Sequence, residues 1–299
     1  MIKTQDAGRE TLDTGQKEEI SCLESSVLSP VSLFRIFFIG DVIGHSGRAA
    51  VGSILPELKK EIRACDGVPL MVIANGENLA GGLGITQGTA DELFSCGVDL
   101  LTTGNHVWDR KEILKYIDQD ERILRPANYP EGAPGRGHTV MKLEGKPPVA
   151  VFNLSGRVFM DPLDDPFAAA RNIVPALREK AKIIILDFHA EATSEKMAMG
   201  WYLDGQVSAV IGTHTHVQTA DERILPAHTA YITDVGMTGP FDSIIGTKID
   251  LIIQKFTTQM PVRFEVAKGD VMLSAVIIDV DQNTGRAVSI KRLQRIVKR

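Results

Sequence analysis

Cysteine is scarce in this sequence of 299 residues, which contains only Cys22, Cys65 and Cys96. The three thiols are widely spaced, and no two of them form a Cys-x-x-Cys pair. An odd number of isolated cysteines argues against a disulfide framework and against a zinc knuckle. We therefore expect a protein of the reducing cytoplasm.

Long apolar runs and an excess of positive charge are also missing. No stretch approaches the roughly 20 apolar residues that span a bilayer, and residues 1–30 lack the basic start and apolar core of a secretory signal. The formal net charge of -5 argues against a protein whose main task is to bind nucleic acid electrostatically. We expect a soluble protein with no membrane partner, in which residues 1–32 form a flexible extension and residues 33–299 form one domain.

What the sequence does contain is an alternation of short apolar runs with helix-like segments, which is typical of βαβ units whose central strands are buried on both faces. The expected strands in this part are 33–40, 70–74, 99–103, 149–154, 182–187 and 207–211. The expected helices are 49–64, 86–96, 108–117, 165–180 and 194–203, and Pro56 is expected to interrupt the first of them.

The pattern becomes rich in strands after residue 221. Strands are expected at 229–233, 262–267, 271–281 and 287–295, with a helix at 246–256. Asn283-Thr284-Gly285 favours a hairpin turn between the last two strands. We find no linker that separates two units, so the pattern predicts one domain with two sheets.

Polar side chains of the kinds that bind metals follow five of the apolar strands. These residues are Asp41; Asn75, Glu77 and Asn78; Asn105 and His106; His189 and Glu191; and His214 and His216. The carboxyl ends of parallel strands lie along one edge of a sheet, where α/β proteins bind their ligands. We therefore expect these groups to converge.

The segment Gly212-Thr213-His214-Thr215-His216 directly follows one apolar run. Neutral imidazole is the commonest metal ligand in proteins, and alternate residues of an extended segment point to the same side. This geometry suits one or two metal ions. The alternative is a pair of solvated histidines in a polar loop.

A ligand set drawn from these residues could hold two carboxylates, up to two asparagine carbonyls and three imidazoles, without a thiolate. Such a set suits iron, manganese or zinc. Seven candidates are too many for one tetrahedral ion, whereas two ions that share a bridging carboxylate would use them. We expect Glu77 to be the bridge because its neighbour Asn78 can support it.

Each of these residues also has an ordinary structural explanation. Asp41 could cap a helix, the residues around Gly76 could form a turn, and Asn105-His106 could be a surface turn. His189 could be a partly buried histidine with satisfied hydrogen bonds. The joint occurrence of such residues at five strand ends favours a metal site.

Three of these blocks, Gly40-Asp41, Gly104-Asn105-His106 and Gly212 to His216, resemble in order and spacing those of the calcineurin-like metallophosphoesterases. The Asn75-Gly76-Glu77-Asn78 block and the run from Phe188 to Lys196 resemble a bacterial branch, the YmdB-like phosphodiesterases. The resemblance covers residues 34–297. Asp41 is not followed by the Asp-x-His histidine of the wider superfamily, and Glu77 replaces its bridging Asp; both departures are expected of this branch.

The resemblance implies a fold and a division of ligands. The fold is a four-layer α/β/β/α sandwich. One metal would be held by Asp41, Glu77 and His216, completed by Asn78, and the second by Glu77, Asn105, His189 and His214. His106 would be the catalytic residue that stabilises the phosphate or protonates the leaving oxygen.

The implied activity is that of a metal-dependent phosphodiesterase. It would hydrolyse cyclic nucleotides, 2′,3′-cyclic monophosphates above all, by attack of a hydroxide that bridges two ions of iron or manganese, with zinc as the alternative. One rival is a phosphomonoesterase or nucleotidase on the same scaffold. Another is a regulatory protein that senses a nucleotide or docks an RNA-processing partner. The strands near the C-terminus would also permit a homo-oligomer.

Overall fold

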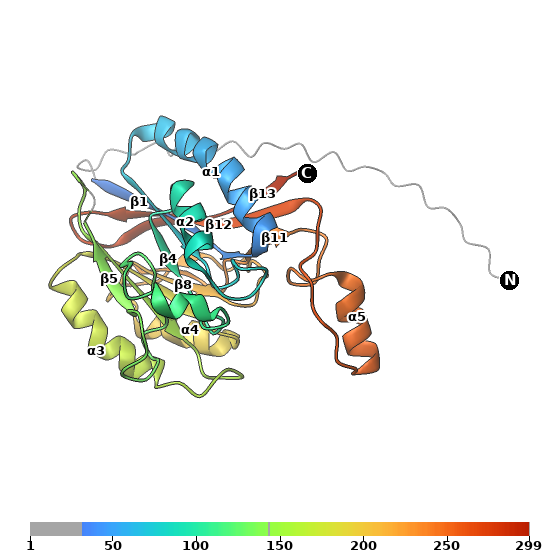
Figure 1. Ribbon diagram of the computed structural model, residues 1–299. Coiled ribbons are helices and arrows are strands. Elements are labelled where there is room, and N and C mark those ends of the chain that lie inside the picture. Colours follow the sequence, from blue (N-terminus) through green and yellow to red (C-terminus); the bar gives the residue numbers. More distant parts are fainter. Residues whose placement is uncertain (1–31, 143, 299) are drawn as a thin grey trace.

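Two β-sheets stack face to face in the computed structural model, which describes residues 32–142 and 144–298 (Figure 1). Helices cover the outer faces of both sheets. The expected N-terminal extension, apart from residue 32, lies outside the described residues. Within the part of the chain that is described, no helix has the length and apolar character needed to cross a membrane.

The first sheet has seven strands in the order β2-β11-β12-β1-β3-β4, with β13 paired to β12. Strands β1, β3 and β4 are parallel, and β12 is antiparallel to β1 and β13. The bounds are β1 Leu33–Ile39, β2 Asp41–Val42, β3 Leu70–Asn75, β4 Leu100–Thr102, β11 Met237–Pro240, β12 Val271–Asp281 and β13 Ala287–Val297.

The second sheet has six strands in the order β5-β6-β7-β8-β10-β9. Its four central strands, β6, β7, β8 and β10, are parallel. The bounds are β5 His138–Met141, β6 Val149–Ser155, β7 Ile183–His189, β8 Ala209–Thr213, β9 Arg223–Ile224 and β10 Ala230–Ile232.

Two helices pack on the outer face of each sheet. The first sheet is covered by α1 Gly44–Asp66 and α2 Gln87–Ser95, and the second by α3 Pro166–Arg178 and α4 Thr193–Tyr202. The start of α3 is set locally, because the Asp165 carboxylate accepts the Phe167 backbone N–H at 2.8 Å and Pro166 stands at the first helical position. A fifth helix, α5 Ile249–Thr258, stands apart from the sheets at the right of Figure 1.

The apolar run of β1 shows why the sheets are buried on both faces. Phe34, Ile36 and Phe38 belong to the core between the two sheets. Phe37 and Ile39, which point the opposite way, pack in the core under α1 and α2. A third core lies between the second sheet and its helices α3 and α4. Three cores between four layers confirm the expected α/β/β/α sandwich.

Most of the expected elements are present, but the prediction that Pro56 interrupts the first helix is wrong. Helix α1 runs for 23 residues with Pro56 inside it. Proline removes one helical hydrogen bond. The apolar face formed by Val51, Leu55, Leu58 and Ile62 is nevertheless buried along the helix, and this packing holds it together.

Two further predictions, a helix at 108–117 and a strand at 262–267, are also wrong. Residues 108–117 contain only a short 3-10 helix, Lys111–Lys115, because Ile113 and Tyr116 donate to carbonyls three residues back. Residues 262–267 form no strand, and Val266 makes only an isolated bridge to Thr247. The hairpin turn at Asn283-Thr284-Gly285 is confirmed: Gly285 has φ 75° and its N–H donates to Asp281 O at 2.8 Å.

Arg35 and Asp279 form a buried ion pair between adjacent strands β1 and β12. Arg35 Nε lies 2.6 Å from Asp279 Oδ1, and Arg35 Nη2 lies 3.0 Å from Oδ2. Asp279→Ala would remove the two carboxylate contacts of a buried guanidinium, which we expect to lower the free energy of unfolding by about 3–5 kcal/mol in urea titrations.

The matched control is Glu121→Ala. Glu121 Oε2 lies 3.8 Å from Arg136 Nη1, and both side chains are exposed. We expect little change because water already solvates an exposed pair. Equal losses in the two variants would contradict a structural role for the Arg35–Asp279 pair.

Candidate metal centre

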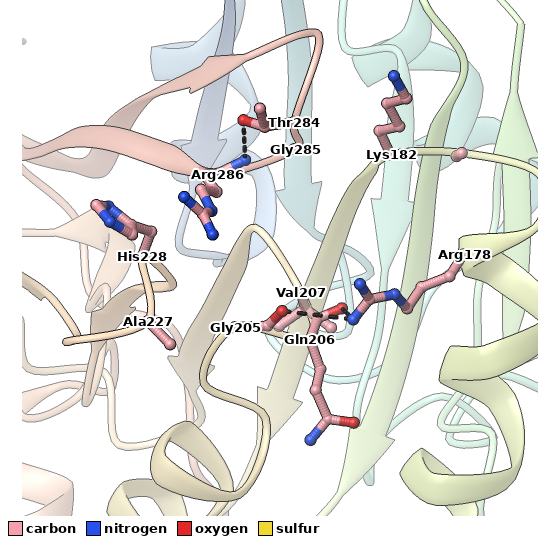
Figure 2. A pocket seen from close by; sticks show the side chains of 11 residues that line it. Arg178, Lys182, Gly205, Gln206, Val207, Ala227, His228, Thr284, Gly285 and Arg286 are labelled. Atoms are coloured by element: carbon pink, nitrogen blue, oxygen red, sulfur yellow. Dashed lines mark hydrogen bonds between the residues drawn. The ribbon is translucent and has the colours of Figure 1, made fainter.

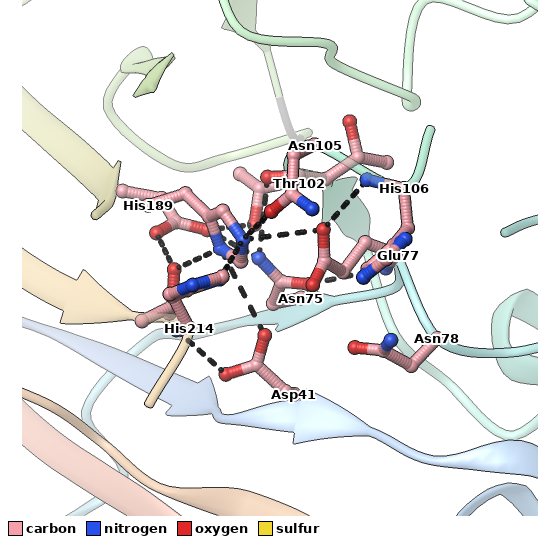
Figure 3. Close-up of polar contacts among 12 residues, drawn as sticks. Asp41, Asn75, Glu77, Asn78, Thr102, Asn105, His106, His189 and His214 are labelled. Atoms are coloured by element: carbon pink, nitrogen blue, oxygen red, sulfur yellow. Dashed lines mark hydrogen bonds and ion pairs between the residues drawn. The ribbon is translucent and has the colours of Figure 1, made fainter. Parts of the chain in front are cut away.

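Five segments distant in sequence meet at one edge of the sandwich (Figure 3). Asp41 lies on β2, Glu77 follows β3, Asn105 follows β4, His189 ends β7 and His214 follows β8. Asp41, Glu77 and His189 are essentially inaccessible to solvent. The expected convergence of polar strand ends is therefore present, with contributions from both sheets.

The ring nitrogen Nε2 of His189 is the point at which these groups meet. It lies 3.0 Å from Asn105 Oδ1, 3.0 Å from His214 Nδ1 and 3.2 Å from Glu77 Oε2. A single imidazole nitrogen carries one proton or one lone pair, so it cannot bond to three partners at once. Four atoms with lone pairs gathered in this way suit the ligands of a metal ion.

A second group of potential ligands shares Glu77 with the first. Asp41, Glu77 and His216 each offer one atom within 4.8 Å of the others, as do Glu77, His189 and His214. Asp41 Oδ1 and Asn78 Oδ1 are buried and have no hydrogen-bond partner among the described residues. Because a buried oxygen without a partner is costly, these two atoms also suit a cation at this edge.

His214 and His216 belong to different groups because the chain leaves strand geometry at Thr213. Both histidines have left-handed backbone conformations, with φ 103° and 65°. The expectation of an extended segment is therefore wrong, although both rings reach groups that include Glu77. His216 Nδ1 lies 3.0 Å from Ile245 O, and donation to this carbonyl leaves Nε2 free to act as a ligand.

His189 is oriented from behind by a buried hydrogen-bond chain. Its Nδ1 lies 2.9 Å from Thr213 Oγ1, which donates to Asp187 Oδ1 at 2.7 Å. Because the hydroxyl proton is used on Asp187, Thr213 accepts from His189 Nδ1–H, and the Nε2 lone pair faces the other ligands. Asn75 Nδ2 and Thr102 Oγ1 donate to the other oxygen of Asp187, at 3.0 and 2.5 Å.

Sequence reasoning missed the roles of Asp187 and Thr102, which stand inside expected strands, and of Thr213, which stands between an apolar run and His214. The signal that could have found them is a polar residue within a buried run, such as Asp187 in Ile-Ile-Ile-Leu-Asp-Phe. Asn75 was expected to be a ligand type. In the structure it donates to Asp187 and also accepts the Glu77 backbone N–H at 3.0 Å, so it holds other residues in place.

Ligand histidines usually donate their second ring nitrogen to a carboxylate or carbonyl, so the sequence predicts this role for Glu191 and Asp234. The structure separates the roles of these two residues. Glu191 Oε2 lies 3.0 Å from His214 Nε2, in agreement with the expectation. Asp234 Oδ2 instead accepts from Lys196 Nζ at 2.6 Å and from the Thr215 backbone N–H at 3.0 Å. Asp234 thus fixes the residue between the two histidines.

His106 lies at the rim of the site, with 32% of its side chain exposed. Its backbone N–H donates to Glu77 Oε2 at 3.1 Å, and its Nδ1 lies 2.9 Å from Asp109 Oδ2. Donation from Nδ1 to this carboxylate leaves Nε2 as the ring atom that is available to a bound molecule. His45, His138 and His228 are exposed and belong to neither ligand group.

The buried charges shift one another strongly. Burial raises the pKa of Asp41 to about 7. Burial opposes the charged form of Glu77, but the nearby His189 lowers the pKa of this carboxyl to about 2. Burial likewise opposes protonation of His189, but Glu77 and Asp41 raise its pKa to about 9, whereas burial and His189 lower the pKa of His214 to about 3. The raised pKa of His189 and the lowered pKa of Glu77 place a proton on the imidazole, where its positive charge offsets the negative charge of the carboxylates. A bound cation would displace this proton.

Gly104 leaves room for this cluster. A Cβ at this position would lie 2.3 Å from both Glu77 Oε2 and His189 Nε2. We expect Gly104→Ala to lower metal affinity by at least about tenfold because it displaces two potential ligands. Metal analysis combined with chelator competition would measure this change.

Gly88→Ala is the matched control, because a Cβ there meets nothing within 4 Å and Gly88 lies in helix α2. Its metal affinity should equal that of the wild type. Unchanged metal affinity in Gly104→Ala, with the fold intact, would contradict a metal centre beside this glycine.

Comparisons with known proteins agree with this geometry. The family described as YmdB-like protein matches residues 37–293. A Bacillus subtilis (strain 168) protein named 2′,3′-cyclic-nucleotide 2′-phosphodiesterase is 53% identical over 259 residues, which cover 87% of this chain and 96% of the relative.

Two solved structures are similar along nearly their whole length. A hypothetical protein from Thermus thermophilus has a TM-score of 0.81 and 42% identity, with 88% of this chain and 99% of that chain covered. A phosphatase from Mycoplasma pneumoniae has a TM-score of 0.82 and 34% identity, with 90% of this chain and 95% of that chain covered.

Proposed function

The chain belongs to the YmdB-like branch of the metallophosphoesterases, and we propose that it is a metal-dependent phosphodiesterase that hydrolyses 2′,3′-cyclic nucleotides. The observation that supports this proposal most directly is that two groups of potential metal ligands share Glu77. The name of the Bacillus subtilis relative supports the substrate class. We also propose that the protein is cytoplasmic. That it binds an RNA-processing partner and that it forms a homo-oligomer remain predictions.

Two metal ions would be held by the residues of these groups. Asp41, Glu77 and His216 would hold one ion, with Asn78 Oδ1 beside them. Glu77, Asn105, His189 and His214 would hold the other. Nitrogen and oxygen donors without a thiolate favour iron or manganese, with zinc as the alternative. When bound, such ions activate the water that attacks phosphorus and neutralise charge on the phosphate.

The protein's own side chains supply orientation and proton transfer. The His189–Thr213–Asp187 chain keeps one imidazole lone pair directed into the site. His106 Nε2 would donate a proton to the ribose 2′ oxygen as its bond to phosphorus breaks, which leaves a 3′-phosphate. Asp109 binds the opposite nitrogen of this ring and so orients Nε2 toward a bound molecule.

The substrate class and the role of His106 are tested together. We expect the metal-loaded enzyme to hydrolyse 2′,3′-cyclic AMP faster than AMP, and His106→Ala to lower kcat for the cyclic substrate by about 10² to 10⁴ with metal content unchanged. Steady-state kinetics and metal analysis measure both.

His138→Ala is the control, because His138 is exposed on β5 and outside both ligand groups. Its kcat should match that of the wild type. Faster hydrolysis of AMP would favour the phosphomonoesterase. A full set of metals with no turnover of either compound would favour the regulatory binding protein.

The two histidines after β8 allow the ligand division to be tested. His214 groups with Glu77 and His189, whereas His216 groups with Asp41 and Glu77. His214→Ala and His216→Ala should therefore each retain a different ion, which metal-specific spectroscopy of the manganese- or iron-loaded variants would distinguish. Loss of the same ion from both variants would refute the division.

A further inference from the structure

A cavity lies at the edge of the second sheet that is opposite the candidate metal centre (Figure 2). Its walls come from the residues just before β7, β8 and β10 and from the β12–β13 hairpin. The candidate metal centre uses the far ends of β7 and β8. Since β7 has seven residues and a strand rises about 3.3 Å per residue, the two sites are separated by roughly 20 Å.

The cavity is positively charged although the protein carries a net charge of -5. Arg178, Lys182, Arg286 and His228 line it, and no Asp or Glu does. Figure 2 shows Arg178 and Arg286 on opposite sides of the pocket. The Arg178 guanidinium reaches toward Gly205 and Gln206, where its Nη1 lies 3.4 Å from each carbonyl oxygen. Cations gathered in a concave site repel one another and attract an anion.

Asp204 and Asp281, which lie near pocket residues in the sequence, accept hydrogen bonds from other groups. Asp204 accepts the backbone N–H groups of Ala227 at 2.9 Å and Thr229 at 3.3 Å. Asp281 accepts from the Asn283 N–H and the Thr284 hydroxyl in the hairpin. Glu179 lines an adjoining cavity together with Arg178, Lys180 and Lys182. Among the described residues, the three Arg and Lys side chains of the pocket form no ion pair.

The pocket is held in shape by close backbone contacts. A Cβ on Gly285 would lie 2.0 Å from Lys182 O, so only glycine allows the hairpin to approach the start of β7. Ser208 Oγ donates to Gly285 O at 2.6 Å, and the Ala287 N–H donates to His228 O at 2.9 Å. The backbone that carries Lys182, His228 and Arg286 is therefore held in place without a ligand.

We propose that this pocket is a binding site for a small phosphate monoester, separate from the metal centre. Guanidinium groups match the paired oxygens of a phosphate, and two of them on opposite walls can hold one phosphate from both sides. The cavity of about 440 Å³ has the size of a small-molecule site and can hold a mononucleotide. The proposal depends on the charge and shape of this pocket and does not require the proposed activity.

Hydrogen–deuterium exchange of the metal-loaded protein tests this site locally. The probes are 3′-AMP, orthophosphate and adenosine. We expect 3′-AMP and orthophosphate, but not adenosine, to slow exchange in residues 205–208 and 282–287. Equal apparent affinities would identify the phosphate group alone as the ligand, and tighter binding of 3′-AMP would identify a nucleotide. Both results support the proposal.

Variants separate the pocket from the metal centre. Arg178→Gln combined with Arg286→Gln should weaken this protection by at least about tenfold, because two charge-assisted contacts are lost. Arg171→Gln, on the exposed face of the same helix α3, should leave it unchanged. Metal content and the unfolding midpoint should match those of the wild type in both variants.

Three results would overturn the proposal. The first is an absence of protection by either phosphate compound in the wild type. The second is protection that survives in the double variant. The third is protection by an oligonucleotide without terminal phosphates at a lower concentration than 3′-AMP, which would identify the pocket as a contact for a nucleic-acid backbone.

Discussion

The buried carboxylate of Asp187 is the constraint on which the metal centre depends. It lies on β7 of the second sheet and accepts hydrogen bonds from Asn75 and Thr102 of the first sheet, as well as from Thr213 of the second. Burial raises the pKa of Asp187, and the three donors favour its charged form. Because a buried charge without such partners is very costly, the two sheets are held in one relative position at this edge.

That position determines the geometry of the site. Glu77 and Asn105 come from the first sheet, and His189 and His214 come from the second, so their ligand atoms meet only when the sheets are correctly aligned. Thr213 connects the alignment directly to the chemistry, since it bonds both Asp187 and His189. The opposite edge of the same sheet carries the basic pocket. The second sheet thus presents candidate metal ligands at one end of its strands and the basic pocket at the other.

The sequence allowed the strand ends to be predicted because apolar runs stop abruptly at polar residues. Asp41, Glu77 and His189 could be found in this way. The strand pattern predicted the two sheets, and the family resemblance implied the four layers. The supporting residues could not be predicted. Asp187 looks like an exception inside an apolar strand, and its partners Asn75 and Thr102 are identified only by the packing of two sheets.

The left-handed conformation of His214 and His216 depends on contacts with residues such as Asp234 and Ile245, which are distant in sequence. The basic pocket is assembled from turns far apart in sequence, so no local pattern marks it.

The most direct measurement is a crystal structure of the metal-loaded protein with anomalous scattering recorded at the absorption edge of the bound metal. We expect two peaks, one among Asp41, Glu77 and His216 and the other among Glu77, His189 and His214, with Glu77 in contact with both. A single peak in fully loaded protein, or a Glu77 carboxylate that contacts neither ion, would contradict a two-metal centre bridged by this residue.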